Sequence, residues 1–408
     1  MAKDQSSYFA GKHLWSETKD DLLSCYLTPY FQKVFPFSKG GIVYVDAFAG
    51  EGKFADGTLG SPLIALSKLQ SIARGMRAKV PVQFVLAESN SDSRAKLVSS
   101  FRAARGNSRY VKEPIVCDDF QHAIGSARSV VLKSGCRPST YFVYIDPFGV
   151  KDLRMDLLRD LPNPRHAEVL LNFNTIGFIR DACAALKSAL AVPSTIEVAD
   201  EALSFELPAS ERIARLTSCI GSEDWVDIVR ARQNNATEFW EAEYQIARLF
   251  CKNAATHYRF VTNMPVKDMR CGAYGRGLIK YRMIHMTNNA DGCVLMNDNM
   301  LKRNAERQTI QPGMFVVDVD GRDVEPSSIQ RAVNCVIESS RLGEKVKMAE
   351  IAASVISRCG VFSKSTKLLK DYVKPLLDSG VLERVEKVTP SGKPKNSFAP
   401  KDLVYKAR

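Results

Sequence analysis

The sequence lacks the features that would place it in a membrane or make it a metalloprotein. In its 408 residues no apolar run approaches the length of a membrane-spanning helix, so we expect no membrane partner. The ten cysteines stand singly, without a CxxC pair or a Cys/His group at metal-ligand spacing, so we predict no metal site. The N-terminus, MAKDQSSYFAGKH, is polar and unlike a signal peptide. We therefore expect reduced, mostly buried thiols in a cytoplasmic protein.

Acidic residues are also scarce, above all near the C-terminus. The chain carries 57 Lys and Arg against 45 Asp and Glu, a formal net charge of +12. Residues 331–408 alone hold 16 basic and 8 acidic residues, and so supply most of the excess. A basic surplus of this kind indicates a polyanionic partner, with nucleic acid, either DNA or RNA, as the first candidate.

The first part of the chain alternates short apolar runs with helical patterns. The apolar runs show no polar alternation, as is typical of strands that are buried on both faces of a parallel sheet. This alternation predicts an α/β fold with a doubly wound, Rossmann-like sheet. The predicted strands are residues 42–45, 82–86, 114–117, 141–145 and 168–171. The predicted helices are residues 14–34, 61–72, 92–104 and 121–134.

The remainder of the chain predicts an insertion, a linker and a second domain. Residues 175–255 are interpreted as a helical insertion in a domain that spans 1–310, with closing strands near 258–262 and 281–286, the last of them a candidate antiparallel strand. Residues 311–326 are rich in Pro, Gly and Asp and predict a linker. Three helices and a basic β-hairpin over residues 327–408 predict a C-terminal winged-helix domain. These elements are the helices 328–341, 346–358 and 364–379 and the strands 381–387 and 403–406.

A glycine-rich loop directly after the first strand is the first candidate site. Glycines let the backbone turn sharply and approach a ligand closely. In open α/β sheets, ligands bind at the carboxyl ends of the strands. The helix that follows begins at Ser61-Pro62, which predicts serine at the N-cap and proline in the first turn. The loop residues expected to line a ligand are Asp46, Phe48, Ala49, Gly50 and Gly52.

Two acidic positions follow the next strands. Glu88 comes just after the second strand, where a carboxylate can accept hydrogen bonds from both ribose hydroxyls of a nucleoside. Asp118 follows the third strand and is placed to contact an adenine amino group. Each residue alone is more typical of a surface loop, but together with the glycine loop they favour a nucleoside site.

The segment Asp146-Pro147-Phe148-Gly149 ends the strongest strand. An exocyclic amine is a poor nucleophile because its lone pair is delocalised into the ring. If Asp146 and the carbonyl of Pro147 accept its two hydrogens, the lone pair turns toward an incoming methyl group. The ring of Phe148 can stack on the base. The alternative is a simple strand-ending turn with a core phenylalanine.

These motifs together resemble the class I S-adenosylmethionine-dependent methyltransferases, and more specifically the three-Cys-motif partner family. The matching stretches are HLWSETKDDLLSCYL (13–27), YVDAFAGEGKFADGTLGSPLIALSKL (44–69), FVLAES (84–89), YFVYIDPFG (141–149) and VLLNFNTIGFIRDA (169–182). The resemblance implies that Asp46, Gly50 and Gly52 line S-adenosylmethionine, that Glu88 takes the ribose and Asp118 the adenine, and that Asp146 faces the reactive end. It also implies a neighbouring partner protein with three cysteines, similar to radical S-adenosylmethionine proteins.

The D-P-F-G motif bears on the substrate. It resembles the motif of tRNA guanine-N2 methyltransferases and departs from the D/N-P-P-aromatic motif of adenine-N6 enzymes. We therefore expect a methyltransferase that acts on an exocyclic amine of a nucleic acid base. The alternatives are a nucleic-acid-binding module or an accessory partner of the radical-enzyme-like protein, each with a non-catalytic fold. Lys19, on the first helix, is interpreted as a residue that packs this helix on its neighbour; the alternative, which the resemblance suggests, is that it closes over the substrate.

Lysines in the C-terminal domain are the candidate nucleic-acid contacts. Lys364, Lys367 and Lys370 recur every three residues on the third predicted helix, as expected of a recognition helix. Lys393 and Lys395 lie in the loop of the predicted wing, where they can contact phosphates. The alternative is a solvated face on a protein-binding winged helix.

Overall fold

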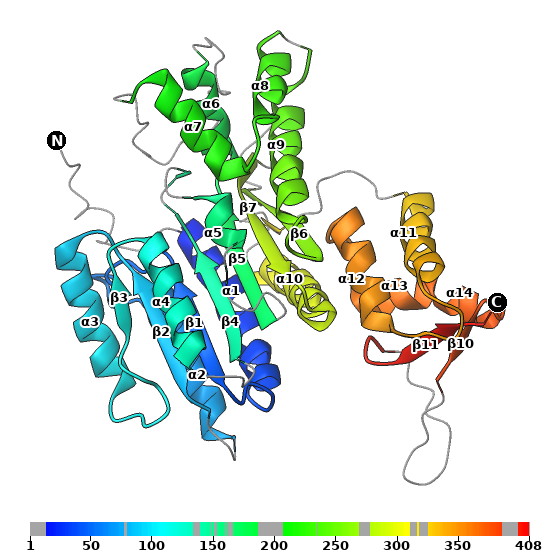
Figure 1. The fold of residues 1–408 in the computed structure, drawn as a ribbon, viewed down its shortest axis with the longest axis horizontal. Coiled ribbons are helices and arrows are strands. Elements are labelled where there is room, and N and C mark those ends of the chain that lie inside the picture. Colours follow the sequence, from blue (N-terminus) through cyan, green and yellow to red (C-terminus); the bar gives the residue numbers. More distant parts are fainter. Residues whose placement is uncertain are drawn as a thin grey trace.

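In a computed structural model, the main body of the chain is built on an eight-stranded sheet with the order β3-β2-β1-β4-β5-β7-β6-β8 (Figure 1). The first five strands in this order are parallel, whereas β7 is antiparallel to both β5 and β6. The strands are β1 (Gly41–Asp46), β2 (Val82–Ala87), β3 (Ile115–Cys117), β4 (Ser139–Ile145), β5 (Ala167–Phe173), β6 (Phe260–Asp268), β7 (Leu278–Thr287) and β8 (Val316–Val317). The predicted α/β class, with its mostly parallel sheet, is confirmed.

The structure describes most of the chain. The described ranges are residues 14–76, 80–133, 139–147, 149–150, 153–159, 161, 166–186, 207–234, 236–268, 278–310, 316–317, 325–385 and 399–407.

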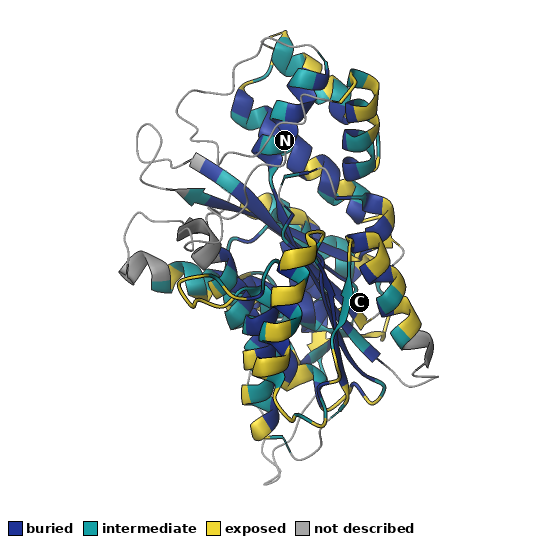
Figure 2. Cartoon of the chain, turned by 90° about the vertical axis from the view of Figure 1, so that its left-hand side faces the viewer, coloured by how far each residue is buried: buried dark blue, intermediate teal, exposed yellow. Residues whose placement is uncertain are grey.

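Helices cover both faces of the sheet, which places its strands in the interior (Figure 2). Alternate residues of each strand enter two separate cores: Tyr44 packs beneath α1, α2 and α3, and Val45 packs against α4 on the other face. This double coverage is why the parallel strands are mostly apolar. The helices are α1 (Leu14–Val34), α2 (Ser61–Arg74), α3 (Ser91–Arg105), α4 (Phe120–Lys133), α5 (Met155–Arg159) and α10 (Ala290–Ile310). The sequence patterns did not predict α5 or α10.

Four helices follow β5, where the sequence predicts a helical insertion. They are α6 (Thr175–Ala185), α7 (Ala209–Ile220), α8 (Trp225–Gln233) and α9 (Phe239–Ala254). Trp225 is fully buried among them and packs edge-on against Phe178. A buried ion pair between Arg282 of β7 and Glu243 of α9, with two contacts of 2.6 Å, ties the insertion to the sheet.

The C-terminal unit contains four helices and a three-stranded antiparallel sheet of order β10-β11-β9. Its elements are α11 (Pro326–Ser339), β9 (Lys345–Lys347), α12 (Met348–Cys359), α13 (Ser365–Tyr372), α14 (Lys374–Asp378), β10 (Leu382–Arg384) and β11 (Leu403–Lys406). The predicted helix at 346–358 was wrong at its start, because Lys345–Lys347 pair with β11. The predicted helix at 364–379 is broken at Val373, since Pro375 has no N–H with which to continue α13.

The C-terminal unit packs directly on the main body. Ser357 of α12 accepts a hydrogen bond from the amide of Val261 at 3.0 Å, and the apolar core beneath α10 continues into α12. Asp298 of α10 accepts hydrogen bonds from the amide and hydroxyl of Ser365, at the start of α13. Within the predicted linker, Val316–Val317 pairs with β6. These contacts join the C-terminal unit to the main body through both α10 and β6.

The eight cysteines among the described residues are free thiols, and burial raises the pKa of Cys219 and Cys293. Of the helices in the described ranges, none combines the length and the apolar character needed to cross a membrane.

Candidate active site

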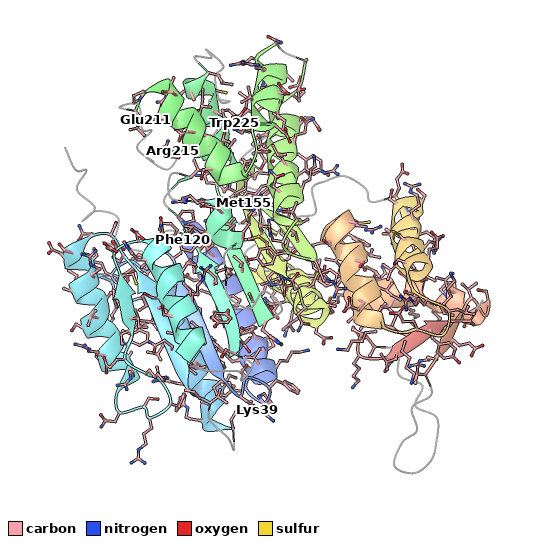
Figure 3. All side chains as sticks on the ribbon, in the orientation of Figure 1. Lys39, Phe120, Met155, Glu211, Arg215 and Trp225 are labelled. Carbon is pink, nitrogen blue, oxygen red and sulfur yellow. The ribbon has the colours of Figure 1, made fainter. Side chains whose placement is uncertain are left out.

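Three polar side chains meet at the carboxyl edge of the sheet, on neighbouring strands. Asp46 ends β1, Asp146 follows β4, and Asn172 lies near the end of β5. In Figure 3, Lys39 lies at the amino edge, just before β1, and Phe120 lies toward the carboxyl edge. Because parallel strands end together, the fold gathers residues that are far apart in sequence into one site.

Asp146 is held by two donors from different elements. The ammonium of Lys19, on α1, lies 2.8 Å from Oδ1 and 2.7 Å from Oδ2 of Asp146, and Asn172 Nδ2 donates to Oδ1 at 2.6 Å. The Lys19 side chain is 10% exposed and lies 5.7 Å from the ring centre of Tyr281, on β7. Lys19 is buried, as the packing interpretation expects, and its ammonium also compensates the charge of Asp146.

Two buried acceptors beside this ion pair have no hydrogen-bond partner in the part of the chain that the structure describes. Asn172 Oδ1 and Asp46 Oδ2 are buried and make no hydrogen bond to the described residues. The orientation of the Asn172 amide follows from its partner, because an ionised carboxylate can only accept, so the NH₂ group must face Asp146. Unpartnered buried acceptors are uncommon in folded proteins, and they are expected where a ligand supplies the missing donor.

Asp46 is fully buried, and burial raises its pKa to about 7. The hydroxyl of Ser61 and the amide of Phe48, which donates to Asp46 Oδ1 at 3.3 Å, act in the opposite direction on this pKa. The nearby charge of Asp146 adds to the increase. Ser61 was predicted as an N-cap, but Gly60 occupies that position and Ser61 is the first residue of α2. Asp46 therefore changes protonation near neutral pH.

The glycine loop follows the predicted pattern. Gly50 and Gly52 have φ angles of +59° and +76°, in the left-handed region that favours glycine. A Cβ on Gly52 would lie 2.9 Å from Leu97 of α3, so the loop is held close to that helix. The Ala49 amide donates to the carbonyl of Ala87 at 2.8 Å, which joins the loop to the end of β2. Phe48 is half-buried on the α4 side of the sheet.

The two other predicted acids differ in their surroundings. Glu88 is half-buried at the end of β2, and its Oε1 accepts from the amide of Asn90 at 2.8 Å. Asp118 is exposed, and its Oδ1 lies 2.8 Å from Nδ1 of His122, which also contacts Asp119. A backbone hydrogen bond and the nearby imidazole lower the pKa of Asp118, while Asp119 and Asp118 raise that of His122.

Asp118, Asp119 and His122 place possible metal-ligand atoms within 4.8 Å of one another. All three are exposed, and no buried polar group among the described residues supports the cluster. It gives no reason to revise the expectation of a protein without a metal site.

The predicted lysines of α13 lie on its open face. Lys364, Lys367 and Lys370 are exposed, whereas Ser365 is fully buried against α10. The start of α13 is thus occupied by contacts with the main body. Lys393 and Lys395, in the predicted wing, and Phe148, the predicted stacking residue, lie outside the described residues; Pro147 is described and buried.

A scan against protein-family models finds no match for this chain, and a search of curated proteins finds none either. The family resemblance therefore depends on the sequence motifs alone.

Proposed function

We propose that the chain is an S-adenosylmethionine-dependent methyltransferase that acts on an exocyclic amine of a nucleic acid base. The observation that carries this proposal is the convergence of Asp46, Asp146 and Asn172 at the carboxyl edge of β1, β4 and β5, beside a loop with two left-handed glycines. The order β3-β2-β1-β4-β5, followed by an antiparallel β7, accords with the class I methyltransferase fold that the sequence resembles.

The cofactor side of the site would be formed by β1 and β2. The backbone of Gly50 and Gly52 allows close approach of the ligand, and Asp46, when ionised, offers a buried acceptor for the cofactor's ammonium group. Glu88 would accept from the ribose hydroxyls, with its carboxylate already oriented by the amide of Asn90. Asp118 contributes less, because it is exposed and bonded to His122.

The chemistry would be assisted by Asp146. Bound S-adenosylmethionine supplies an electrophilic methyl group on a sulfonium. The Asp146 carboxylate would accept a hydrogen bond from the attacking amine and so direct the lone pair of the nitrogen toward the methyl group. Lys19 and Asn172 fix the carboxylate in one orientation, so its position is set before the substrate binds. Such preorganisation and proximity supply most of what an in-line transfer needs.

The C-terminal unit would bind the nucleic acid as a winged-helix domain. The succession of α11, β9, α12 and α13, followed by two antiparallel strands, supports this assignment. Because the start of α13 is buried against α10, we propose that Lys364, Lys367 and Lys370 contact phosphates and do not read bases. The same lysines would serve the second candidate function, a nucleic-acid-binding module without catalysis.

The cofactor assignment is tested by calorimetric titration of the protein with S-adenosylmethionine. We expect wild-type binding in the micromolar range, and we expect Glu88→Gln to weaken it by about 10- to 100-fold, because a ribose hydroxyl loses a charged partner. Glu113→Gln, which alters an exposed carboxylate that pairs with Arg102 just before β3, away from the proposed ribose site, is the control and should bind normally. A folded wild-type protein that fails to bind would favour the binding-module function.

The nucleic-acid surface is tested by the salt dependence of binding to a fluorescent RNA or DNA duplex. Replacing Lys364, Lys367 and Lys370 with alanine should lower the slope of log K against log salt by about 3, roughly one for each phosphate that is no longer neutralised. The control removes three exposed lysines at the amino edge of the sheet, Lys33, Lys39 and Lys112, and so changes the net charge equally. Equal slopes for the two triple variants would reject α13 as the binding surface.

A further inference from the structure

We propose that Asn172, in place of the Pro147 carbonyl that the sequence suggested, is the second acceptor for the substrate amine, and that the site therefore takes a primary amine and stops after one methyl transfer. This inference depends on the proposed methyltransferase function and specifies its substrate and product. It rests on the hydrogen-bonding capacity that remains at Asp146 and Asn172 once their contacts with each other and with Lys19 are made.

The donors and acceptors of this cluster can be counted. Asp146 Oδ1 accepts from both Lys19 and Asn172, so its capacity is used, whereas Oδ2 accepts from Lys19 alone among the described residues and can take one more donor. The NH₂ group of Asn172 donates to Asp146. The Oδ1 atom of Asn172 is buried and has no hydrogen-bond partner among the described residues. Two acceptor positions therefore remain, on adjacent side chains, for the hydrogens of a ligand.

A primary amine matches these two positions. The amine would donate one hydrogen bond to Asp146 Oδ2 and one to Asn172 Oδ1. Its lone pair would then point toward the methyl group. A hydroxyl nucleophile has a single hydrogen and would leave one buried acceptor unpaired. The site would discriminate against it, since an unpaired buried acceptor is costly. The preferred substrate is therefore an unmodified exocyclic amine.

The two remaining acceptor positions also limit the reaction to one methyl transfer for each amine. In the first transfer the bond between the methyl group and the cofactor's sulfur would break as the N–CH₃ bond forms, which leaves a neutral thioether. The nitrogen would release one proton by way of Asp146 to solvent, and so carry one hydrogen and one methyl group. To react again it must place the methyl group against Asp146 Oδ2 or Asn172 Oδ1, where the methyl group displaces a hydrogen bond and adds bulk beside a part-buried ion pair. We expect the second transfer to be slower than the first by about 10- to 100-fold.

The test measures the product ratio. In vitro transcribed RNA and amplified DNA, both free of methylated bases, are incubated with the protein and S-adenosylmethionine, digested to nucleosides, and analysed by mass spectrometry. The wild-type protein should yield monomethylated amines almost alone. In Asn172→Ala, which removes the acceptor and leaves space for a methyl group, the ratio of dimethylated to monomethylated product should rise at least about tenfold while total transfer falls.

The ratio separates this role from a purely structural one, because a loss of folding lowers both products together. Asn263→Ala, which removes an amide that contacts Arg282 on the neighbouring strand, is the matched control and should leave the ratio unchanged. Abundant dimethylated product from the wild-type protein, or an unchanged ratio in Asn172→Ala, would overturn the inference while methyl transfer itself is upheld. No methyl incorporation by the wild-type protein would overturn the proposed function and the inference with it.

Discussion

Asp146→Asn is expected to slow methyl transfer by about 100- to 1,000-fold while the affinity for S-adenosylmethionine stays within about threefold of wild type. The substitution keeps the shape of the side chain, so Asn172 and Lys19 remain close to it. It removes the negative charge that stabilises positive charge developing on the attacking amine. The effect should therefore appear in the rate of single-turnover methyl transfer, measured with saturating cofactor, and not in calorimetric binding.

Stability has to be followed in the same variant. The Lys19 side chain is 10% exposed and that of Asp146 is 23% exposed, so the loss of the countercharge should destabilise the protein by less than the roughly 3–5 kcal/mol of a fully buried ion pair. The double variant Lys19→Met with Asp146→Asn removes both charges and should recover much of this stability without recovering activity. Asp227→Asn, at an exposed position on α8, is the control for the substitution itself. Wild-type rates in Asp146→Asn would exclude the catalytic role of this carboxylate.

The sheet and the glycine loop were predictable because their signals are local. A strand covered on both faces must be mostly apolar, and β1, β2 and β5 are buried along their whole length. Glycines at left-handed φ angles are required by the backbone itself, so Gly50 and Gly52 are visible in the sequence without any knowledge of their neighbours.

The ion pair at Asp146 was not predictable in the same way. Lys19 and Asp146 are 127 residues apart, and helical periodicity shows only on which face of α1 the lysine lies. Asn172 did leave a signal that was not used: it is a polar residue in the otherwise apolar run Val169–Phe173 of a buried strand. A buried amide needs a partner, so such a residue at a strand's carboxyl end should be considered a site candidate.

The stability of the protein is expected to fall as the pH rises from about 4 to about 7, because of Asp46. Burial raises its pKa from 3.8 to about 7, so the folded state keeps a proton that the unfolded state has already lost. The folded state binds more protons in this interval, and the free energy of unfolding therefore decreases with pH. The resulting decrease in the free energy of unfolding is roughly 4 kcal/mol at most, and it is complete once the pH is well above the pKa of about 7.

Asp46→Asn should remove this dependence, since an amide stays neutral throughout. Urea unfolding at about pH 5 and about pH 8 should show a smaller loss of stability in Asp46→Asn than in wild type, with Asp56→Asn, on the exposed part of the glycine loop, as the control. Equal losses in wild type and Asp46→Asn would mean that Asp46 is already ionised at pH 5.

The same proton couples to the proposed cofactor. If the ammonium group of S-adenosylmethionine binds the ionised form of Asp46, binding must release the proton that Asp46 holds below pH 7. The affinity should then rise about tenfold between pH 5.5 and 6.5, and the calorimetric enthalpy should change with the ionisation enthalpy of the buffer. Asp46→Asn should bind more weakly and lose both effects. A wild-type affinity independent of pH in this interval would place the ammonium group elsewhere, even if the protein binds the cofactor.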